Sequence, residues 1–363
     1  MHGQLVIADI SGYTPFLTEG ELEHAHEIVT ELLNSIIDAI DAPLAISNVE
    51  GDAVFLYGET PPDIYGQTVI ETVERLYVSF SSALENMVLN TTCDCNACAN
   101  INTLGLKIVM HCGEFVKSKV GNTETLTGPD VIAVHRLLKN SVKEKTGIVD
   151  YFLVTQACVD DLGLERIVAA WTEHSEDYEH VGEVKAYVSS LTDVWSFVRQ
   201  QRAIKVLAAD SWFTHQAHTA APPAIVWDHL IDPRKRRAWT EADSSELLGE
   251  TDGRAGPGSE YHCAHGDTIA VFTVLDSRPT EYMTIMIPIN EGAATVTYTH
   301  YLIPSGAGTR IVTFMAEPAG SDSPDAPSMP LDALRPIMEA NLNDGVTRLC
   351  EMTDATAAAL AQA

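Results

Sequence analysis

Two aspartates at the ends of apolar segments are the first candidates for chemistry in this chain. Asp9 comes near the end of an apolar run that begins at Leu5, and Asp52 stands directly before the run 53–56. Both runs predict buried strands, because they are short, apolar and bounded by turn residues. Two carboxylates on adjacent strand ends suit Mg²⁺ or Mn²⁺, which take a few protein oxygens and leave other positions to phosphate and water. We therefore predict a divalent metal site at Asp9 and Asp52.

The turn that follows Asp9 is a second candidate. Its residues, Ser11-Gly12-Tyr13-Thr14, break the strand at a glycine. Backbone N–H groups at such a turn, where a helix starts, can bind a phosphate. Gly12 is therefore a candidate nucleotide-contacting position. Because a single aspartate at a strand end is commonly a cap or turn residue, the prediction depends on the two motifs occurring together.

Two later stretches extend this pattern. They are a strand and turn at 106–115 and a glycine turn followed by a helical segment at 125–137. In this order the motifs resemble the class III adenylate/guanylate cyclase homology domain. The resemblance implies that Asp9 and Asp52 bind metal, that Thr125 selects the purine, and that Arg136 stabilises the transition state. The chain departs from the family pattern at Ile132, where the family has Asn, and at Asn48, where it has a base-contacting Lys.

The two departures differ in their consequences for chemistry. Metal ions and an arginine carry most of the charge stabilisation in phosphoryl-type transfer, whereas loss of one neutral donor costs roughly a hundred-fold in rate. Loss of a base contact weakens discrimination between purines. The resemblance thus predicts a slow or relaxed cyclase, or a nucleotide-binding domain without turnover. It also implies a homodimer in which Asp9 and Asp52 face Arg136 of the partner subunit.

A different kind of metal site is indicated by three closely spaced cysteines, Cys93, Cys95 and Cys98. Thiolates at such spacing can converge on one Zn²⁺. Cys112 is excluded as a fourth ligand, because a strand over 104–112 would place it about 26 Å from the strand's beginning. The fourth ligand would be a histidine, such as His24 or His26, or would come from a partner chain. Alternatively, the thiols are free and both histidines lie on the helix surface.

Composition restricts the classes of protein that fit. The chain has 363 residues, enough for about two domains, and a net charge of −29 from 22 Lys plus Arg and 51 Asp plus Glu. Such a charge repels nucleic-acid backbones and anionic lipids. No apolar run approaches the roughly 20 residues of a membrane span, and no signal-peptide pattern is present. Seven cysteines, an odd number, favour reduced thiols. We expect a cytoplasmic protein that binds neither nucleic acid nor membrane.

The first half of the chain, 1–204, predicts a ferredoxin-like α/β sandwich of the class III cyclase type. Its periodicities alternate between helical and strand-like segments. The expected helices are 20–40, 63–90, 129–141, 156–163 and 191–202, and the expected strands are 4–10, 44–49, 52–57, 106–112, 115–120, 151–154 and 178–188. We place the domain boundary between 204 and 205.

The second half, 205–363, has a different order of elements. A strand at 212–218 and a helix opened by Pro222-Pro223 precede six strand-like segments, at about 245–250, 259–263, 268–276, 281–287, 293–303 and 309–316. A linker over 318–330 then leads to one amphipathic helix, 331–354. This order predicts a curved antiparallel sheet wrapped around a long helix, with a cavity between them. Over about 208–355 it resembles the START-like SRPBCC (polyketide cyclase-type) helix-grip family, which implies binding of an apolar small molecule.

Two features of the second half remain open. Six polar residues are candidates to face the cavity, although strand alternation turns about half of such residues to solvent; they are Tyr261, His262, His265, Tyr298, His300 and Tyr301. The basic cluster 234–237 is either a solvated turn or a docking element for the acidic first domain.

For the whole chain, two functions compete. One is nucleotide-linked signalling tuned by an apolar ligand, and the other is a non-catalytic carrier or sensor of such a ligand on a degenerate cyclase-like scaffold. A dedicated zinc protein is a third possibility.

Overall fold

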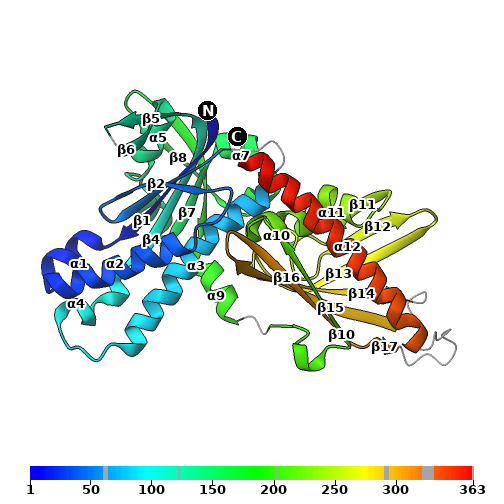
Figure 1. The fold of residues 1–363 in the computed structure, drawn as a ribbon. Coiled ribbons are helices and arrows are strands. Elements are labelled where there is room, and N and C mark those ends of the chain that lie inside the picture. Colours follow the sequence, from blue (N-terminus) through cyan, green and yellow to red (C-terminus); the bar gives the residue numbers. More distant parts are fainter. Residues whose placement is uncertain (60–63, 122, 201–202, 290–293, 321–330, 362–363) are drawn as a thin grey trace. The chain divides into compact units, whose positions relative to one another are not determined.

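The chain folds into two compact units, Met1–Gln201 and Arg202–Ala363, each with its own main sheet. The computed structural model describes all residues except 60–63, 122, 201–202, 290–293, 321–330 and 362–363. Figure 1 shows the two units and the labels of their elements. In the described part of the chain, no helix combines the length and apolar character needed to cross a bilayer.

The first unit contains a seven-stranded sheet in the order β2-β3-β1-β4-β7-β9-β8. Its strands are β1 (His2–Ser11), β2 (Ala45–Glu50), β3 (Ala53–Glu59), β4 (Gly105–Glu114), β7 (Tyr151–Thr155), β8 (Thr172–Tyr178) and β9 (Gly182–Ser190). The central strand β1 pairs antiparallel with both β3 and β4, and β2 pairs antiparallel with β3. With helices between β1 and β2 and between β3 and β4, this is the ferredoxin-like arrangement, so the predicted fold class is confirmed.

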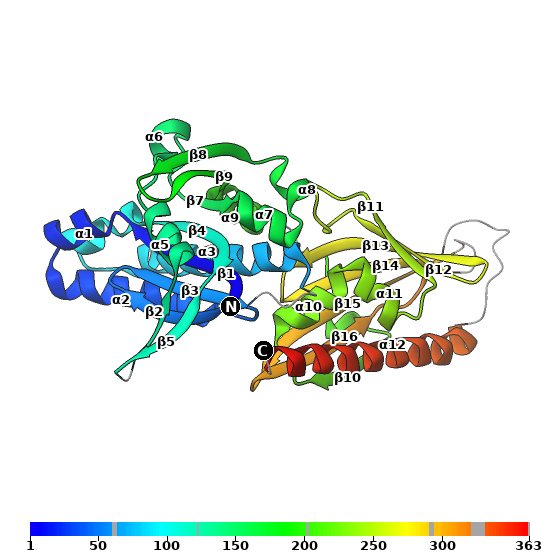
Figure 2. The same ribbon diagram turned by 90° about the horizontal axis from the view of Figure 1, so that it is seen from above.

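Helices cover both faces of this sheet (Figure 2). The helices of this unit are α1 (Tyr13–Glu19), α2 (Leu22–Asp38), α3 (Gly66–Asn90), α4 (Asn96–Ala99), α5 (Pro129–Leu137), α6 (Val142–Thr146), α7 (Gln156–Leu162), α8 (Glu165–Val168), α9 (Leu191–Gln200) and the 3₁₀ helix η1 (Ile101–Thr103). Leu5 and Ile7 of β1 pack in one core with Val131 and Val134 of α5. Because both faces of β1 are covered, its residues read as a continuous apolar run rather than an alternating one.

Two details of the first unit differ from the sequence prediction. The expected single strand 178–188 contains a turn, since β8 ends at Tyr178 and β9 begins at Gly182. His180 and Gly182 both have positive φ there, 71° and 83°. The alternating pattern continues through this turn, so the period of two did not reveal it. In addition, β5 (Val116–Val120) pairs with β6 (Thr123–Thr127) in a separate two-stranded sheet. The strand that follows β4 therefore forms a hairpin with β6 and not with β4.

The second unit is a helix-grip fold, as predicted. Its antiparallel sheet has the order β10-β16-β15-β14-β13-β12-β11. The strands are β10 (Phe213–Thr219), β11 (Ser244–Leu248), β12 (Glu260–His265), β13 (Thr268–Arg278), β14 (Tyr282–Ile289), β15 (Ala294–Ser305), β16 (Gly308–Met315) and β17 (Ala319–Gly320), and the helices are η2 (Ala208–Asp210), α10 (Pro223–Ile231), α11 (Pro233–Trp239) and α12 (Leu331–Leu360). The long helix α12 packs against β10, α10 and α11 (Figure 2). The predicted positions 63, 201–202, 293 and 321–330 lie outside the described residues.

The basic cluster 234–237 lies in a helix, and two of its four side chains are buried. The expectation of a solvated turn is therefore wrong for those two residues. The cluster is part of α11, in which Lys235 and Arg236 are buried. Lys235 forms an ion pair with the buried Asp228 of α10. The backbone N–H of Arg234 donates to the carboxylate of Asp232, which caps the helix. The acidic residues that hold α11 come from α10 and its end, so the sequence pattern of four basic residues did not show their burial.

Candidate functional sites

The structure brings Asp9 and Asp52 to the same edge of the first sheet. Asp9 lies opposite Ala53 in the pairing of β1 with β3, and Asp52 immediately precedes that strand. The backbone N–H of Ile10 donates to the Asp52 carbonyl at 3.0 Å. Burial and the negative charge of Asp9 raise the pKa of Asp52. The negative charges of Asp9 and Asp52 therefore act on each other across this end of the sheet.

A lysine that the sequence reasoning did not select completes this edge. Lys107 of β4 lies directly opposite Asp9, and its Nζ is 2.9 Å from Asp9 Oδ2. The same ammonium donates to the carbonyl of Leu138 at 3.2 Å. Its charge works against the rise in the pKa of Asp52. Lys107 thus partly neutralises the pair from within the chain. The signal was present in the sequence, as a single cation within the otherwise largely apolar strand 105–112.

Two further residues make local contacts: Gly12, a predicted nucleotide contact, and Asn48, which stands at the family's base-contacting position and is a candidate nucleotide contact for that reason. Gly12 precedes α1 with φ +83°, and a Cβ added there would lie 2.9 Å from the carbonyl oxygen of Thr103. Backbone conformation and close packing alone therefore require a glycine. The amide of Asn48 donates to Glu50 Oε1 at 2.7 Å on the same strand, β2.

Thr125 and Arg136 also form hydrogen bonds with neighbouring residues of the first unit. Thr125 Oγ1 is 3.1 Å from Ser118 Oγ within the small β5–β6 sheet. Arg136, on α5, donates from Nη1 to the carbonyl of Glu179 at 2.9 Å. Among the described residues, no hydrogen bond or ion pair joins Gly12, Asn48, Thr125 or Arg136 to the two aspartates.

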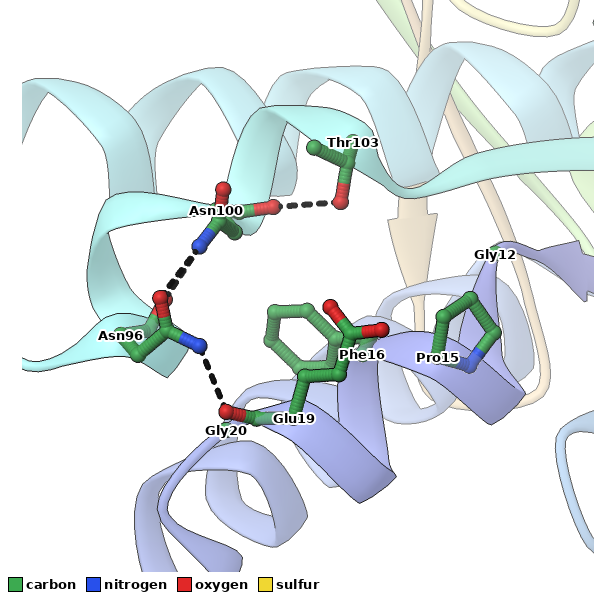
Figure 3. Close-up of a pocket in the computed structure, with 8 residues that line it drawn as sticks. All are labelled: Gly12, Pro15, Phe16, Glu19, Gly20, Asn96, Asn100 and Thr103. Carbon is green, nitrogen blue, oxygen red and sulfur yellow. Dashed lines mark hydrogen bonds between the residues drawn. The ribbon is translucent and has the colours of Figure 1, made fainter.

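A small cavity of about 240 Å³ lies beside the Gly12 turn (Figure 3). Its lining residues come from α1 and from the segment containing α4 and η1; they are Gly12, Pro15, Phe16, Glu19, Gly20, Asn96, Asn100 and Thr103. The amide of Asn96 donates to the Glu19 carbonyl, and the amide of Asn100 donates to the Asn96 carbonyl at 2.8 Å. The two asparagines therefore use these donors to hold the cavity wall together.

The three clustered cysteines converge on one histidine. Nδ1 of His24, on α2, lies 3.2 Å from Cys95 Sγ, 3.6 Å from Cys93 Sγ and 3.7 Å from Cys98 Sγ. The four candidate ligand atoms all lie within 4.8 Å of one another. His26, the other histidine considered, is exposed, and Cys112 is buried in β4. None of the seven cysteines, all of which lie among the described residues, is joined to another by a disulfide.

The second unit contains a larger cavity, of about 580 Å³. It lies between α12 and the sheet, and its lining is Trp239, Thr240, Glu241, His265, Ala270, Phe272, Ile287, Pro288, Ile289, Tyr298, His300, Met315, Met338, Asn341, Leu342, Asp344, Gly345, Val346 and Arg348. Three of the six polar residues predicted to face inward, His265, Tyr298 and His300, belong to this lining. The other three do not belong to it. Their polar atoms contact the Ile231 carbonyl (Tyr261), Glu260 (His262) and the Val206 carbonyl (Tyr301).

Arg236 lies behind the wall of this cavity and is fully buried. Its guanidinium is 5.1 Å from the ring centre of Trp239 and 4.7 Å from that of Phe272, and both rings line the cavity. A third ring, Tyr261, lies 4.5 Å away. Nη1 donates weakly to the Leu230 carbonyl at 3.5 Å, whereas Nε and Nη2 have no hydrogen-bond partner among the described residues. In the same part of the chain, no carboxylate forms an ion pair with Arg236.

The charge of Arg236 reaches two side chains that line the cavity. Burial raises the pKa of Tyr298, and the adjacent guanidinium opposes that rise. Burial lowers the pKa of His300 to about 3, and the Arg236 charge adds to this effect. His300 is therefore neutral at physiological pH, with Nδ1 2.7 Å from Thr313 Oγ1. Sequence reasoning missed Arg236 because its cluster looked like a surface feature.

Two family models match the chain. Residues 212–351 match the family described as "Polyketide cyclase / dehydrase and lipid transport", which confirms the family predicted for the second unit. Residues 29–146 match a family described as "Protein of unknown function (DUF2652)".

A curated relative places the chain in a family. It is 30% identical over 163 residues to "Uncharacterized protein Rv2561/Rv2562" of Mycobacterium tuberculosis, an alignment that covers 45% of this chain and 73% of the relative. The chain belongs to the family of that mycobacterial protein.

Several solved structures share a distant similarity with the chain. A bacterial light-regulated adenylyl cyclase shares 15% identity with a TM-score of 0.39, over 55% of this chain and 57% of that one. The adenylyl cyclase CyaB from P. aeruginosa shares 13% identity with a TM-score of 0.36, over 52% and 94% of the two chains. Ara h 8.0201 shares 13% identity with a TM-score of 0.31, over 39% and 95%. Likeness at this level concerns the fold and assigns no activity to this chain.

Proposed function

We propose that this protein is a carrier or sensor of an amphipathic small molecule with an anionic group, which binds in the cavity of the second unit. The cyclase-like first unit then serves as its scaffold. One observation supports this proposal above the others. The cavity combines a largely apolar lining with a buried arginine behind its wall that lacks a carboxylate partner among the described residues.

The apolar part of the proposal follows from the shape and lining of the cavity. A volume of about 580 Å³ falls in the range of small-molecule sites, which are typically apolar with a few placed polar groups. Phe272, Ile287 and Met315 line it from the sheet, and Met338 and Leu342 line it from α12. These side chains would contact the hydrocarbon part of a ligand.

The anionic part of the proposal follows from Arg236. Burying a charge costs several kcal/mol unless a partner compensates it, and three aromatic rings offset only part of that cost. An anionic ligand would supply the missing partner. The Tyr298 hydroxyl lies beside the guanidinium and its side chain lines the cavity, so it could donate to the same anion. Ligand binding would thus place the apolar body against α12 and the anion at the Arg236 end.

Two fluorescent probes test this proposal on the full-length protein. They are 8-anilinonaphthalene-1-sulfonate and N-phenyl-1-naphthylamine, which differ only in the sulfonate. Arg236→Met should weaken binding of the sulfonate probe by about tenfold or more, since a charge-assisted contact is worth roughly 1.5–3 kcal/mol. Binding of the neutral probe should stay within about twofold, because its contacts are apolar. Arg237→Met is the matched control, because it removes the same charge from an exposed neighbour.

The outcomes separate the two parts of the proposal. Equal loss of both probes in Arg236→Met would mean that the arginine only supports the packing of the cavity. Absence of an effect on either probe would show that the anion does not bind at Arg236. Binding of neither probe by the wild-type chain would contradict the small-molecule site itself.

A second candidate function, metal-dependent binding of a purine nucleotide by the first unit, is favoured by the interacting pair Asp9 and Asp52. Asp52 and the Asp9 oxygen that does not contact Lys107 would hold Mg²⁺ or Mn²⁺, and the metal would supply charge for the phosphates. Turnover would further need Arg136 of the partner subunit, so a homodimer belongs to this candidate.

Incubation with ATP or GTP and Mn²⁺ tests the second candidate, with nucleotide binding and cyclic product measured together. Asp52→Ala should abolish any binding that depends on the metal. Product that persists in this variant, or nucleotide binding that is the same with and without metal, would contradict the proposed role of Asp52.

A further inference from the structure

We propose that His24, Cys93, Cys95 and Cys98 bind one structural Zn²⁺ ion that ties α2 to the segment between α3 and β4. The site lies in the first unit and is independent of the ligand proposed for the second. Figure 1 shows α1, α2 and α4 side by side at one end of that unit.

The distances match those of a tetrahedral zinc site. With Zn–S bonds of about 2.3 Å and Zn–N bonds of about 2.0 Å, a tetrahedron places nitrogen and sulfur about 3.5 Å apart and two sulfurs about 3.8 Å apart. The observed Nδ1 to sulfur distances are 3.2, 3.6 and 3.7 Å. All four atoms fall within 4.8 Å of one another, so small adjustments would centre them on one ion.

Local backbone contacts already hold the ligands in place. The backbone N–H of Cys98 donates to Cys95 Sγ at 3.4 Å, a contact that stabilises a metal-bound thiolate. The backbone N–H of Ala97 donates to Glu21 Oε2 at 3.0 Å, and Asn96 donates to the Glu19 carbonyl. These contacts join the cysteine segment to the end of α1 and to the start of α2. All four ligand residues are partly exposed, so an ion can enter.

The ligand set indicates both the metal and its role. Three thiolates and an imidazole favour Zn²⁺ over Mg²⁺ or Ca²⁺, which prefer oxygen. Four protein ligands complete a tetrahedron and leave no open position, as in structural sites. Bound zinc would link His24 to Cys93 across 69 residues of chain. It would also fix Asn96 and Asn100, which line the small cavity of Figure 3.

The test is the zinc content of the full-length, untagged protein, purified with a reductant and reconstituted with Zn²⁺. We expect about one zinc ion per wild-type chain, and a value close to zero in Cys95→Ser and His24→Ala. His26→Ala is the matched control, because it changes an exposed histidine two positions away on the same helix, and it should retain the metal. Replacement of zinc by Co²⁺ should give the visible absorption of tetrahedral thiolate coordination in the wild type and in His26→Ala only.

A second pair of measurements uses the wild-type chain alone, so that it does not depend on whether the variants fold. A mercurial reagent that reacts with thiols should release the zinc from the folded wild-type chain, and a chelator should lower its melting temperature. Reconstituted wild-type protein without zinc would overturn the proposal. Equal zinc retention in His24→Ala and His26→Ala, with tetrahedral cobalt spectra in both, would overturn the role of His24.

Discussion

Lys107 in the first unit and Arg236 in the second are both cations in largely apolar surroundings, and they differ in how the chain compensates them. Lys107 has the Asp9 carboxylate 2.9 Å away and a backbone carbonyl beside it. Arg236 is surrounded by three aromatic rings, the Tyr298 hydroxyl and one distant carbonyl. In the described part of the chain, the protein supplies the counter-charge for the lysine and does not supply it for the arginine.

An external anion would gain more binding free energy at Arg236 than at Lys107. A cation already paired with a carboxylate offers little further interaction, because a new anion would have to replace that partner. A buried, unpaired cation carries an unfavourable desolvation energy that a bound anion can recover. This contrast favours the second unit as the ligand-binding part of the chain. In the first unit, a nucleotide phosphate would instead meet two carboxylates and a lysine that is already engaged.

The largest expected change in stability comes from breaking the ion pair between Asp9 and Lys107 in the first unit. Asp9→Leu leaves Lys107 largely buried without its carboxylate, so we expect a loss of about 2 kcal/mol in the free energy of unfolding. The figure is below that for fully buried pairs because both side chains keep some exposure to water. Scanning calorimetry of the full-length chain would measure the shift in the transition of the first unit.

The double variant Asp9→Leu with Lys107→Met is the control for this prediction. Removing both charges should bring the free energy of unfolding back to within about 1 kcal/mol of the wild type, since neither member of the ion pair is left without the other. A double variant as unstable as the single one would mean that Asp9 acts through packing and not through the ion pair.

Most of the fold was predictable from the sequence for a physical reason. Buried strands such as 4–10 and 52–57, and the amphipathic α12, show their environment in the period of their apolar residues. The turn at His180 was missed because a β-turn between two alternating strands need not disturb the period. The end of α12 was also misplaced, since the helix continues from the predicted 354 to Leu360.

The candidate sites were predictable only where neighbours in sequence carry the chemistry. The cysteine cluster and the two aspartates were identified from local motifs, whereas His24 was one of two histidines that the sequence could not separate. Lys107 and Arg236 depend on strand register and on burial, which bring together residues such as Asp9 and Lys107 that lie far apart in the chain. A basic run has the same composition whether its members are exposed or buried, so composition could not distinguish Arg236 from Arg237.

A smaller change in stability is expected when the second carboxylate, Asp52, is replaced. The folded state raises the pKa of Asp52, so the unfolded chain loses this proton at a lower pH, near 3.9. The wild type therefore loses stability as the pH rises from about 4 through the raised pKa, and the loss persists at neutral pH. Asp52→Asn should melt at a higher temperature than the wild type at pH 7, with the difference disappearing below about pH 4.

Melting curves from pH 3.5 to 8, with and without Mg²⁺, would check the Asp52 prediction. If the metal binds the pair, Mg²⁺ should raise the melting temperature of the wild type and leave that of Asp52→Asn unchanged. A variant that is less stable than the wild type at pH 7 would show that the Asp52 carboxylate is compensated in the folded state, contrary to the direction of its pKa.

The smallest effect is expected from Arg236→Met in the ligand-free protein. Methionine fills a similar volume with an apolar side chain, so the loss of contacts with three rings is offset by the removal of an uncompensated buried charge. We expect the free energy of unfolding of the second unit to change by less than about 1 kcal/mol, measured by calorimetry after passage over a hydrophobic resin that removes apolar ligands. Asp9→Leu and Arg236→Met would then differ because only the first leaves a charge unpaired. A loss in Arg236→Met as large as that of Asp9→Leu would mean that the guanidinium holds the core together through its rings, and the proposed anion site would lose its physical basis.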